Sequence, residues 1–518
     1  MKEEFDIIFV LGEIYFDHPL SGAAILKRLL EKNGYSVGII EKPTREEEVK
    51  KLGTPRLFFA VSSGAIDSMV RNYTPLKKRR DEDQYSDYDE SVPDRAVIVY
   101  CNWLRKNFKD SPLILGGTEA SLRRFVHYDY WQNRLRRSIL LDSRADLMVY
   151  GSGEKQILEI AKRIKEKKDL LEIKGTCLIS RELPKDFILL PSEEELIPVK
   201  DDDKTIEESK QKFMQMQLQL NNYQNLAQPT GKRFILQYQS PQYTSKDLDE
   251  YYELPFSREI PKDSKHLRGF EFSVVTHRGC IGNCNFCALR MIQGDKIISR
   301  SEESILREIK NLTKLPYFKG NIDDLGGPSA NMYGMDCQLC HKNCLDCNKL
   351  ERNHKKLIQL LKKARQIPGI KCVYIRSGIR YDLAPHDYIK EVAEHHIYDT
   401  LRIAPEHVNQ DVLRLMNKNK GNYKEFVKYF NSLKSGKKIS YYFIAAHPGS
   451  SMKEAKELAD AVKGLTNVSL QIFTPTPMTM STCVYYTGID PKNKKKVYVP
   501  YTYKEKKEQK RIVMRELN

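Results

Sequence analysis

The stretch that decides the fold is His277-Arg278-Gly279-Cys280-Ile281-Gly282-Asn283-Cys284-Asn285-Phe286-Cys287, whose three cysteines have the spacing Cys-x3-Cys-x2-Cys. The apolar, β-prone segment 270–276 precedes it and predicts a strand. Beyond it, Ser299 and Glu302 have capping-box spacing ahead of an apolar repeat of helical period, which predicts a helix. The cysteines are therefore expected on a loop between a strand and a helix.

Three thiolates on one short loop can bind one metal centre, and soft sulfur ligands select iron–sulfur clusters or zinc. A [4Fe–4S] cube normally takes four cysteines, so three would leave one iron open to a substrate or cofactor. Gly279 and Gly282 let the backbone wrap closely around such a group. Three unconnected buried thiols or a zinc knuckle are the alternative interpretations, because free cysteine is commonly buried.

The loop resembles the motif of the radical S-adenosylmethionine (SAM) enzymes. The resemblance implies that Cys280, Cys284 and Cys287 hold a [4Fe–4S] cluster. It also implies that the open iron is chelated by the amino and carboxylate groups of SAM. Phe286, the aromatic residue before the last cysteine, is then expected near the adenine.

Composition describes a well-charged globular protein of 518 residues, 40% hydrophobic and 30% charged, enough for two to four domains. No apolar run has the length of a membrane span, and the acidic N-terminus is not a signal peptide, so we expect a cytoplasmic protein without a membrane partner. Seven of the 11 cysteines fall between Cys280 and Cys347, and such clustering favours metal binding over disulfides. The formal net charge of +17 fits either a lysine-rich solvated surface or RNA binding, since tyrosines interleave with lysines near the C-terminus.

The first 184 residues predict an α/β domain with a doubly wound sheet, similar to flavodoxin and cobalamin-binding domains. Strands are expected at 6–11, 35–40, 56–61, 96–100, 113–115 and 146–150, with helices at 20–31, 101–107 and 155–165. Cobalamin with a histidine lower ligand usually requires Asp-x-His-x-x-Gly. The sequence Asp17-His18-Pro19-Leu20-Ser21-Gly22 departs from that motif, so we expect cobalamin to be an unlikely cofactor.

The rest of the chain is expected in three parts. Residues 185–268 are rich in proline and polar residues and predict an irregular connector with one helix near 206–220. Residues 269–485 alternate six strands and helices, which indicates a parallel sheet and, by the resemblance, the open (βα)6 partial TIM barrel of radical SAM proteins. Residues 486–518 form a basic C-terminal tail. The barrel strands are expected at 270–276, 320–325, 371–375, 400–403, 438–445 and 468–473.

Several longer strings resemble the YgiQ-type radical SAM family across nearly the whole chain, from about residue 5 to about residue 503. They include Gly116-Gly117-Thr118-Glu119-Ala120-Ser121-Leu122-Arg123-Arg124, His127-Tyr128-Asp129-Tyr130-Trp131 and Ile403-Ala404-Pro405-Glu406-His407. Arg123, Arg124, His127 and Asp129 form a polar cluster after a glycine turn. This cluster predicts either a site for an anionic group or a salt-bridged interface onto the barrel.

The active site of such a barrel lies at the C-terminal ends of its strands. By resemblance, Gly326 and Gly327 receive the amino group of SAM, and Ser377 and Arg380 hold its ribose and carboxylate. Three further strand-end residues are candidate catalytic groups, and a structural hydrogen bond is the alternative for the two histidines. They are Glu406, His407 and His447.

A second cysteine array, Cys337, Cys340, Cys344 and Cys347, has the spacing Cys-x2-Cys-x3-Cys-x2-Cys within an insert at 337–347. Four thiolates this close predict a closed site, either an auxiliary [4Fe–4S] cluster or structural zinc. We favour the cluster, because the array follows the glycine motif at the expected barrel mouth.

We therefore predict a radical SAM enzyme that takes an electron from a flavodoxin- or ferredoxin-type donor and cleaves SAM to a 5′-deoxyadenosyl radical. The substrate is either a small molecule or tRNA, the latter in the manner of the methylthiotransferases. A non-catalytic iron–sulfur protein is the remaining alternative.

Overall fold

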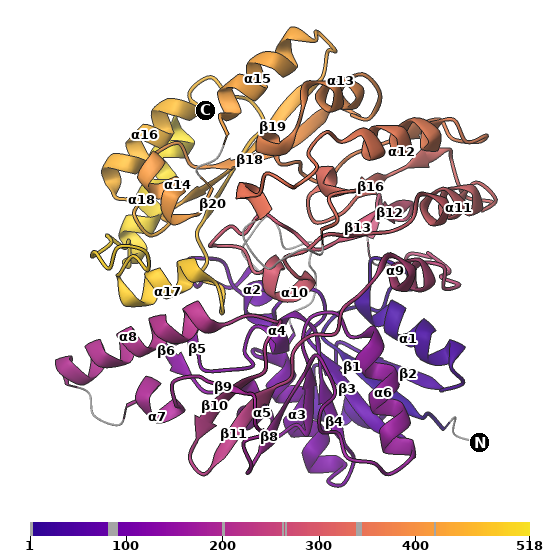
Figure 1. Cartoon of the computed structure of the whole chain (residues 1–518), viewed down its shortest axis with the longest axis vertical. Helices are drawn as coiled ribbons and strands as arrows, with labels where there is room; N and C mark the ends of the chain where they lie inside the picture. Colours follow the sequence, from indigo (N-terminus) through magenta and orange to yellow (C-terminus); the bar gives the residue numbers. More distant parts are fainter. Residues whose placement is uncertain are drawn as a thin grey trace. The chain divides into compact units, whose positions relative to one another are not determined.

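The computed structural model describes residues 4–80, 92–198, 202–261, 264, 267–337, 344–418 and 421–517. The chain divides into two compact units (Figure 1). Unit 1 comprises Met1–Gln242, Leu254–His266 and Pro475–Thr487. Unit 2 comprises Tyr243–Glu253, Leu267–Thr474 and Gly488–Asn518.

Unit 1 is built on a nine-stranded sheet with the order β2-β1-β3-β4-β7-β8-β11-β10-β9. Five neighbouring strands of this sheet, β2-β1-β3-β4-β7, run parallel to one another. Their order is that of flavodoxin-like doubly wound sheets. The predicted fold class of this part is confirmed. The strands are β1 (Ile7–Leu11), β2 (Val37–Glu41), β3 (Phe58–Ser62), β4 (Leu113–Leu115), β7 (Leu147–Val149), β8 (Thr176–Ser180), β9 (Ile188–Leu189), β10 (Leu226–Thr230) and β11 (Arg233–Gln237), with a separate hairpin of β5 (His127–Asp129) and β6 (Arg134–Arg136).

The parallel strands are apolar on both faces because helices cover them, and Ile7, Phe9 and Leu11 are buried beside Leu147 in one core. One strand prediction was wrong: residues 96–100 begin helix α3 rather than a strand. The β-prone run Val97-Ile98-Val99 is overridden because Ala96, Tyr100 and Leu104 lie on one buried helical face. The helices are α1 (Gly22–Lys32), α2 (Ser68–Asn72), α3 (Ala96–Asn107), α4 (Gly117–Ser121), α5 (Ile139–Ser143), α6 (Glu154–Lys165), α7 (Glu193–Leu196), α8 (Asp203–Gln219) and α17 (Met480–Thr487).

The segment that we expected to be an irregular connector instead extends the sheet of unit 1. Its hairpin β10–β11 pairs antiparallel to β8, and β9 adds at the edge. Leu226, Ala227, Ile235 and Leu236 are buried there. Their contribution to the core outweighs the local polarity and the proline at position 229, which had suggested a linker.

Unit 2 contains the six predicted strands, and every adjacent pair that is bonded among them is parallel. The second predicted strand is divided into β15 and β16, and the isolated bridge between Ile379 and Ile403 joins the third strand region to the fourth. The predicted (βα)6 barrel class is confirmed. The strands are β12 (Ser273–Val275), β15 (Asn321–Ile322), β16 (Asp324–Gly326), β17 (Cys372–Val373), β18 (Thr400–Glu406), β19 (Lys438–Ala445) and β20 (Val468–Ile472), and a short pair is formed by β13 (His277–Arg278) and β14 (Ile298–Ser299).

The barrel core includes Ile322, Leu325 and Val373 from the strands and Leu360 and Leu361 from a covering helix. The helix that the capping-box spacing predicted is α11 (Glu302–Leu312). Its N-cap is Ser301, whose hydroxyl accepts a hydrogen bond from the Ser304 amide, so the cap expected at Ser299 lies two residues too early. The helices of unit 2 are α9 (Ser245–Tyr252), α10 (Leu289–Gln293), α11 (Glu302–Leu312), α12 (Lys355–Arg365), α13 (His386–His395), α14 (Gln410–Leu415), α15 (Tyr423–Ser432), α16 (Met452–Val462) and α18 (Tyr503–Arg515).

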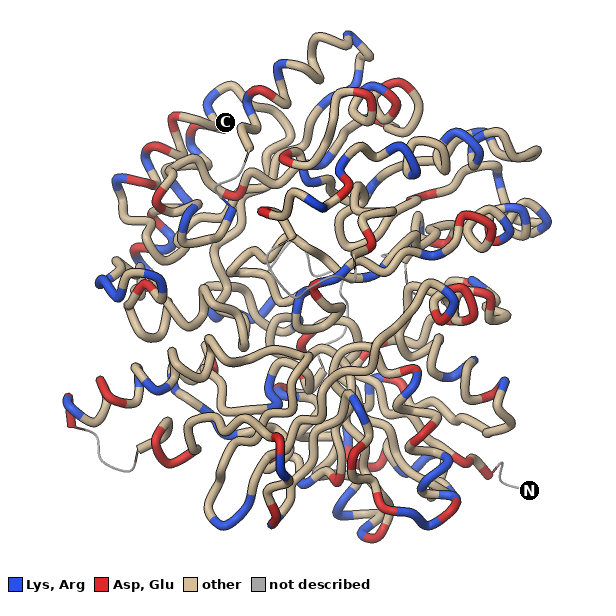
Figure 2. The backbone as a smooth tube through the Cα atoms, in the orientation of Figure 1, with Lys and Arg blue, Asp and Glu red and all other residues tan. Residues whose placement is uncertain are grey.

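The basic C-terminal segment is structured rather than a loose tail, because α18 packs against α16 in unit 2. Figure 2 shows Lys and Arg interspersed with Asp and Glu along the outer helices of both units. No helix in the described part of the chain is long and apolar enough to cross a bilayer.

Candidate active site

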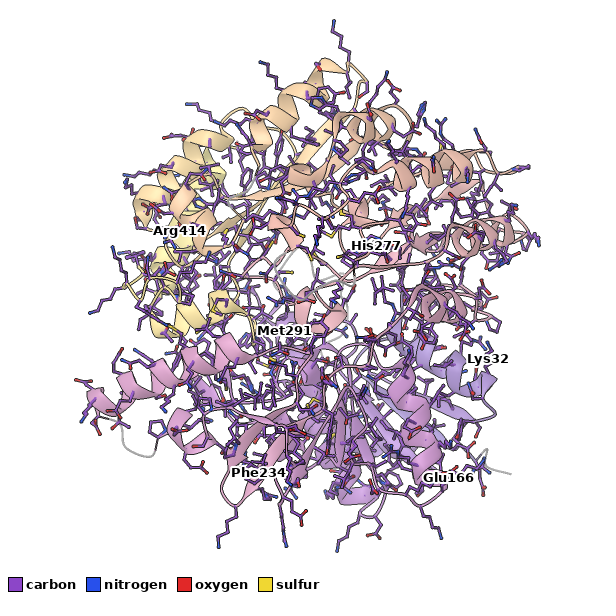
Figure 3. All side chains as sticks on the ribbon, in the orientation of Figure 1. Lys32, Glu166, Phe234, His277, Met291 and Arg414 are labelled. Atoms are coloured by element: carbon purple, nitrogen blue, oxygen red, sulfur yellow. The ribbon has the colours of Figure 1, made fainter. Side chains whose placement is uncertain are left out.

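The cysteine loop, residues 277–287, follows β12 directly (Figure 3, where His277 marks its start and Met291 lies just beyond its end). Gly279 has φ +85, and a Cβ there would lie 1.7 Å from the carbonyl oxygen of Lys296. Only glycine fits this turn, because a side chain would meet backbone in a left-handed conformation. The Cys280 amide then donates to the carbonyl of Gly294 at 3.1 Å, which closes the loop.

The other side of the loop is fixed to the segment that follows α14. The backbone and side-chain amides of Asn285 donate to the carbonyls of Met416 at 2.9 Å and Leu415 at 2.8 Å. The side-chain amide of Asn417 donates to the carbonyl of Asn283 at 2.8 Å. The hydrogen bonds of Asn285 and Asn417 therefore hold the loop without using the cysteine thiols.

The three cysteines of this loop are each partly buried. Burial, together with the neighbouring thiols of Cys284 and Cys280, raises the pKa of Cys287 to about 12. No three His, Cys, Asp or Glu side chains among the described residues are grouped to hold a single metal ion. A cubane binds each thiolate through a different iron, so its ligands need not converge on one point.

Arg380 is aimed at the loop from the region after β17. Its Nε and Nη2 donate to both carboxylate oxygens of Asp382, at 3.0 and 2.5 Å, while Nη1 lies 3.4 Å from the sulfur of Cys284 and from the carbonyl of Gly282. A Cβ on Gly282 would lie 2.6 Å from Nη1, so that glycine leaves the space the guanidinium occupies. Burial opposes the charge of Arg380, but the Asp382 carboxylate and the nearby Cys284 and Cys280 together raise its pKa. Its role toward SAM stays a prediction.

Gly326 ends β16 and Gly327 follows it, beside the start of the cysteine loop. The carbonyl of Gly326 accepts from the Thr276 amide at 2.8 Å. A Cβ on Gly327 would lie 2.5 Å from the His277 ring, so this glycine allows the ring to pack against the backbone. Sequence reasoning did not single out His277, which is fully buried with Nδ1 2.8 Å from the Thr276 hydroxyl.

Ser377 lies near the same edge and is held by Asp324. Its hydroxyl and its amide both donate to the Asp324 carboxylate, the amide at 3.1 Å. The hydroxyl is therefore oriented by a strand residue. Asp324 was missed by sequence reasoning, because no local pattern connects it to a residue 53 positions away.

Glu406 ends β18 at a register shift, with φ +68. It is buried, its Oε1 lies 4.0 Å from the ammonium of buried Lys418, and its Oε2 makes no hydrogen bond to any described residue. Burial raises the pKa of Glu406 to about 7, although the positive charges of Lys418 and Arg380 act to lower it. A carboxylate held in strained backbone with one unused oxygen can accept a proton or a cationic group. Lys418 carried no sequence signal.

His407 and His447 are both buried at the ends of neighbouring strands β18 and β19. Nδ1 of His407 accepts from the Asn409 amide at 3.1 Å, which assigns its proton to Nε2, and Nε2 contacts no acceptor among the described residues. Nδ1 of His447 lies 2.8 Å from the Pro448 carbonyl. Burial lowers the pKa of His407 to about 4 and that of His447 to about 3. Both are neutral near pH 7.

Of the second array, Cys337, Cys344 and Cys347 lie within the described residues, and Cys340 lies outside them. Cys344 and Cys347 pack against the same small apolar cluster as Cys280, a cluster that includes Ile281 and Leu345. The two arrays are therefore neighbours within unit 2.

The polar cluster of unit 1 is bonded internally. Arg123 pairs with buried Asp67, and Asp129 pairs with Arg95 at 2.8 Å. Arg124 donates to Gln237 at 2.7 Å and to Asn222 at 2.8 Å. These arginines bind side chains of their own unit, so the predicted anion site there gains no support.

His18 is buried in unit 1 with both ring nitrogens engaged. Nδ1 accepts from the Leu20 amide at 3.0 Å, and Nε2 lies 3.1 Å from the guanidinium of Arg258. It is therefore not available as a cobalamin ligand.

Two domain families match the chain: Radical SAM N-terminal over residues 1–271 and Radical SAM superfamily over residues 274–462. The chain is 43% identical to a UPF0313 protein of Methanocaldococcus jannaschii, over 99% of this chain and 90% of that one. It is also 43% identical to a UPF0313 protein of Clostridium botulinum strain 657, over 98% and 85%.

Among solved structures, the chain is similar to the radical SAM methyltransferase TsrM from Kitasatospora setae, with TM-score 0.55, 14% identity and coverage of 92% of this chain and 77% of that one. It is similar to the radical SAM enzyme OxsB with TM-score 0.51 and 12% identity, over 92% and 55%. At these identities the likeness concerns the fold. Both structures contain cobalamin, so the expectation that cobalamin is unlikely has no support from them.

Proposed function

Because the chain belongs to the UPF0313 family of radical SAM proteins, we propose that Cys280, Cys284 and Cys287 bind the [4Fe–4S] cluster and that SAM binds at the open iron. Radical SAM enzymes take one electron from a reductant, and this chain is such an enzyme with an unassigned substrate. The observation that carries the residue assignment is the buried Arg380, whose Nη1 lies 3.4 Å from the Cys284 sulfur. A fixed cation there stabilises thiolate ligands that burial alone would keep protonated.

A [4Fe–4S] cluster bound there would supply the electron that cleaves SAM to methionine and a 5′-deoxyadenosyl radical, and that radical would remove a hydrogen atom from substrate. The chain's residues position and enclose that chemistry. Asp382 holds Arg380, Asp324 orients the Ser377 hydroxyl, and Gly327 leaves room beside His277. We propose that Ser377 and Arg380 bind the polar groups of SAM and that the Phe286 ring lies against its adenine.

The three strand-end candidates receive different roles in this proposal. The unused Oε2 of Glu406 accepts a hydrogen bond from a cationic group of SAM or substrate. His407 and His447 are neutral near pH 7, so His407 offers an Nε2–H donor rather than a positive charge. Their burial favours positioning over transfer of protons to solvent.

The test is formation of 5′-deoxyadenosine from SAM by anaerobically reconstituted protein with dithionite. We expect wild type and Cys372→Ala to form it and Cys284→Ala to form none, because Cys372 is a partly buried thiol of unit 2 outside both arrays. Equal product from Cys284→Ala would overturn the assignment. A protein that only transfers electrons would give no product with any variant.

The second array is proposed to bind a second metal centre, and its packing beside Cys280 favours an auxiliary [4Fe–4S] cluster over zinc. Iron and zinc are counted in wild type and in the variant with alanine at Cys337, Cys340, Cys344 and Cys347. About eight irons falling to about four support the auxiliary cluster. About four irons plus one zinc, with the zinc lost in the variant, would replace it with a structural zinc site.

Cobalamin is a second candidate cofactor, because the parallel strand order of unit 1 is flavodoxin-like and its structural neighbours hold cobalamin. With His18 bonded to Leu20 and Arg258, binding would leave the cobalt without a histidine ligand. Equilibrium dialysis against hydroxocobalamin tests this. Uptake of one equivalent, with no nitrogen hyperfine splitting in the cob(II)alamin electron paramagnetic resonance spectrum, supports it. Absence of uptake assigns the chemistry to SAM alone.

A further inference from the structure

The C-terminal part of unit 2 carries an unusual combination of exposed lysines and exposed tyrosines. We call it the basic aromatic surface: the exposed side chains of Lys492, Lys494, Lys495, Lys496, Lys504 and Lys507 together with Tyr498, Tyr501 and Tyr503. We propose that this surface binds single-stranded nucleic acid. The inference goes beyond the radical SAM chemistry and does not depend on it.

The first part of the surface is an ordered loop that presents lysines to solvent. An antiparallel bridge joins Ile489 to Lys496. The Asp490 amide donates to the Lys495 carbonyl, and its Oδ1 accepts from the Lys492 amide, both at 2.9 Å. Backbone bonds thus fix the loop while Lys492, Lys495 and Lys496 remain exposed.

The acidic residue in this loop does not neutralise those lysines. Asp490 is buried and its carboxylate pairs with Arg414 at 2.7 Å. Burial opposes ionisation, but the Lys492 amide and Arg414 lower the pKa of Asp490 below its usual range. The negative charge is therefore balanced by an arginine, and the loop keeps its net positive charge.

The second part is the outer face of α18. Its inner face is fixed by Gln509, which accepts from the Ala446 amide at 3.1 Å and donates to the Ser450 carbonyl at 2.7 Å. Tyr503 and Lys507 are one helical turn apart on the exposed side, with the Lys507 ammonium 5.9 Å from the ring centroid. The helix therefore holds its basic and aromatic groups in one orientation.

The tyrosines decide which partner fits. Tyr498, Tyr501 and Tyr503 are 49%, 52% and 44% exposed, although large aromatic rings are mostly buried. Lysines alone would suit any acidic partner, including an acidic electron-donor protein. Aromatic faces interleaved with lysines match unpaired bases and phosphates, because bases stack on rings while ammonium groups neutralise the backbone. Paired strands bury their base faces, so a single strand is the fitting class.

The test measures fluorescence anisotropy of labelled 12-nucleotide oligo(U) and oligo(dT) with the anaerobic holoenzyme between 50 and 200 mM salt. We expect binding that weakens with salt. The variant with Tyr498→Ala, Tyr501→Ala and Tyr503→Ala should bind about tenfold or more weakly with its salt slope unchanged. The corresponding Tyr→Phe variant should bind like wild type, because stacking needs the ring and not the hydroxyl. Comparing the affinities for oligo(U) and oligo(dT) shows whether the surface prefers single-stranded RNA or single-stranded DNA.

Charge is tested separately. Lys492→Gln, Lys495→Gln and Lys496→Gln together should reduce the slope of log affinity against log salt by about 2, since each phosphate contact contributes about 0.7. The matched control carries Lys165→Gln, Lys167→Gln and Lys168→Gln, three exposed lysines of unit 1, and should bind like wild type. The proposal is overturned if wild type binds neither oligonucleotide at micromolar protein, if the tyrosine variant binds unchanged, or if the control loses as much as the loop variant. All variants should still form 5′-deoxyadenosine, so loss of nucleic-acid binding is distinct from loss of the radical chemistry.

Discussion

Replacing Asp382 with alanine should destabilise unit 2, because it leaves the buried Arg380 guanidinium without its carboxylate. The two side chains are 6% and 4% exposed, and two hydrogen bonds of 3.0 and 2.5 Å join them. Removal of one partner from a buried pair costs about 3–5 kcal/mol. Arg380 would keep its 3.4 Å contacts with Cys284 and Gly282, so we expect the lower end, about 3 kcal/mol.

Amide hydrogen exchange followed by mass spectrometry is the suitable assay, because it reports each unit separately. Both tryptophans, Trp103 and Trp131, belong to unit 1, so their fluorescence does not follow unit 2. A loss of about 3 kcal/mol corresponds to exchange about a hundredfold faster at the protected amides of β16 and β18. Exchange in β1 and β3 of unit 1 should not change.

The matched control is Glu508→Ala. Glu508 also pairs with an arginine through both its oxygens, but Arg511 and Glu508 are 44% and 36% exposed. Exposed pairs are screened by solvent and contribute little to stability, so exchange should change less than about fivefold. Our reasoning is refuted if Asp382→Ala accelerates exchange less than tenfold, or if Glu508→Ala matches it.

Two further perturbations test the loop and the buried histidines. Gly279→Ala should abolish iron incorporation at the cysteine loop because its Cβ would meet the Lys296 carbonyl. Gly436→Ala, with φ +73 and open space, should cost only about 1–2 kcal/mol and keep its iron. Iron counts decide this, with amide exchange in β18 and β19 as the folding check of unit 2. Burial lowers the pKa of His407 from its ordinary 6.5 to about 4. As the pH falls from 6.5 toward 4, the unfolded chain therefore binds a proton at this histidine that the folded chain does not, and the folded state loses stability. Between pH 6 and 5, urea unfolding followed by circular dichroism should show wild type losing about 1.2 kcal/mol more than His407→Asn, and equal losses would contradict the effect of burial on this histidine.

The barrel strands could be predicted because each combines a buried apolar run with a following helix of clear period. The doubly wound sheet followed for the same reason. Sequence patterns did not predict the structure of two segments, residues 96–100 and the segment around Leu226–Thr230. Their structure depends on which distant surface they bury. Local propensity favoured a strand at Val97-Ile98-Val99, and local polarity favoured a linker around Pro229, yet the tertiary core reversed both.

The active site shows the same division. Cysteine spacing and paired glycines are local patterns, so the sequence indicated the loop and its neighbours. The partners that hold the site come from other elements: Asp324 binds Ser377 across 53 positions, and Lys418 reaches Glu406 from beyond α14. Asp382 was visible only as an acid two residues after Arg380, a spacing that predicts no contact by itself.

These partners also indicate that contacts other than those of the cysteine sulfurs fix the position of the cysteine loop. The cysteine loop is anchored by Asn285 and Asn417, whose hydrogen bonds involve backbone carbonyls and no sulfur. Arg380 is held by Asp382 irrespective of the thiols. Contacts within the barrel therefore contribute to the position of the loop, and a bound cluster would add stability to it. Loss of the cluster should accordingly leave the loop anchored, in contrast to small metal domains that unfold without their metal.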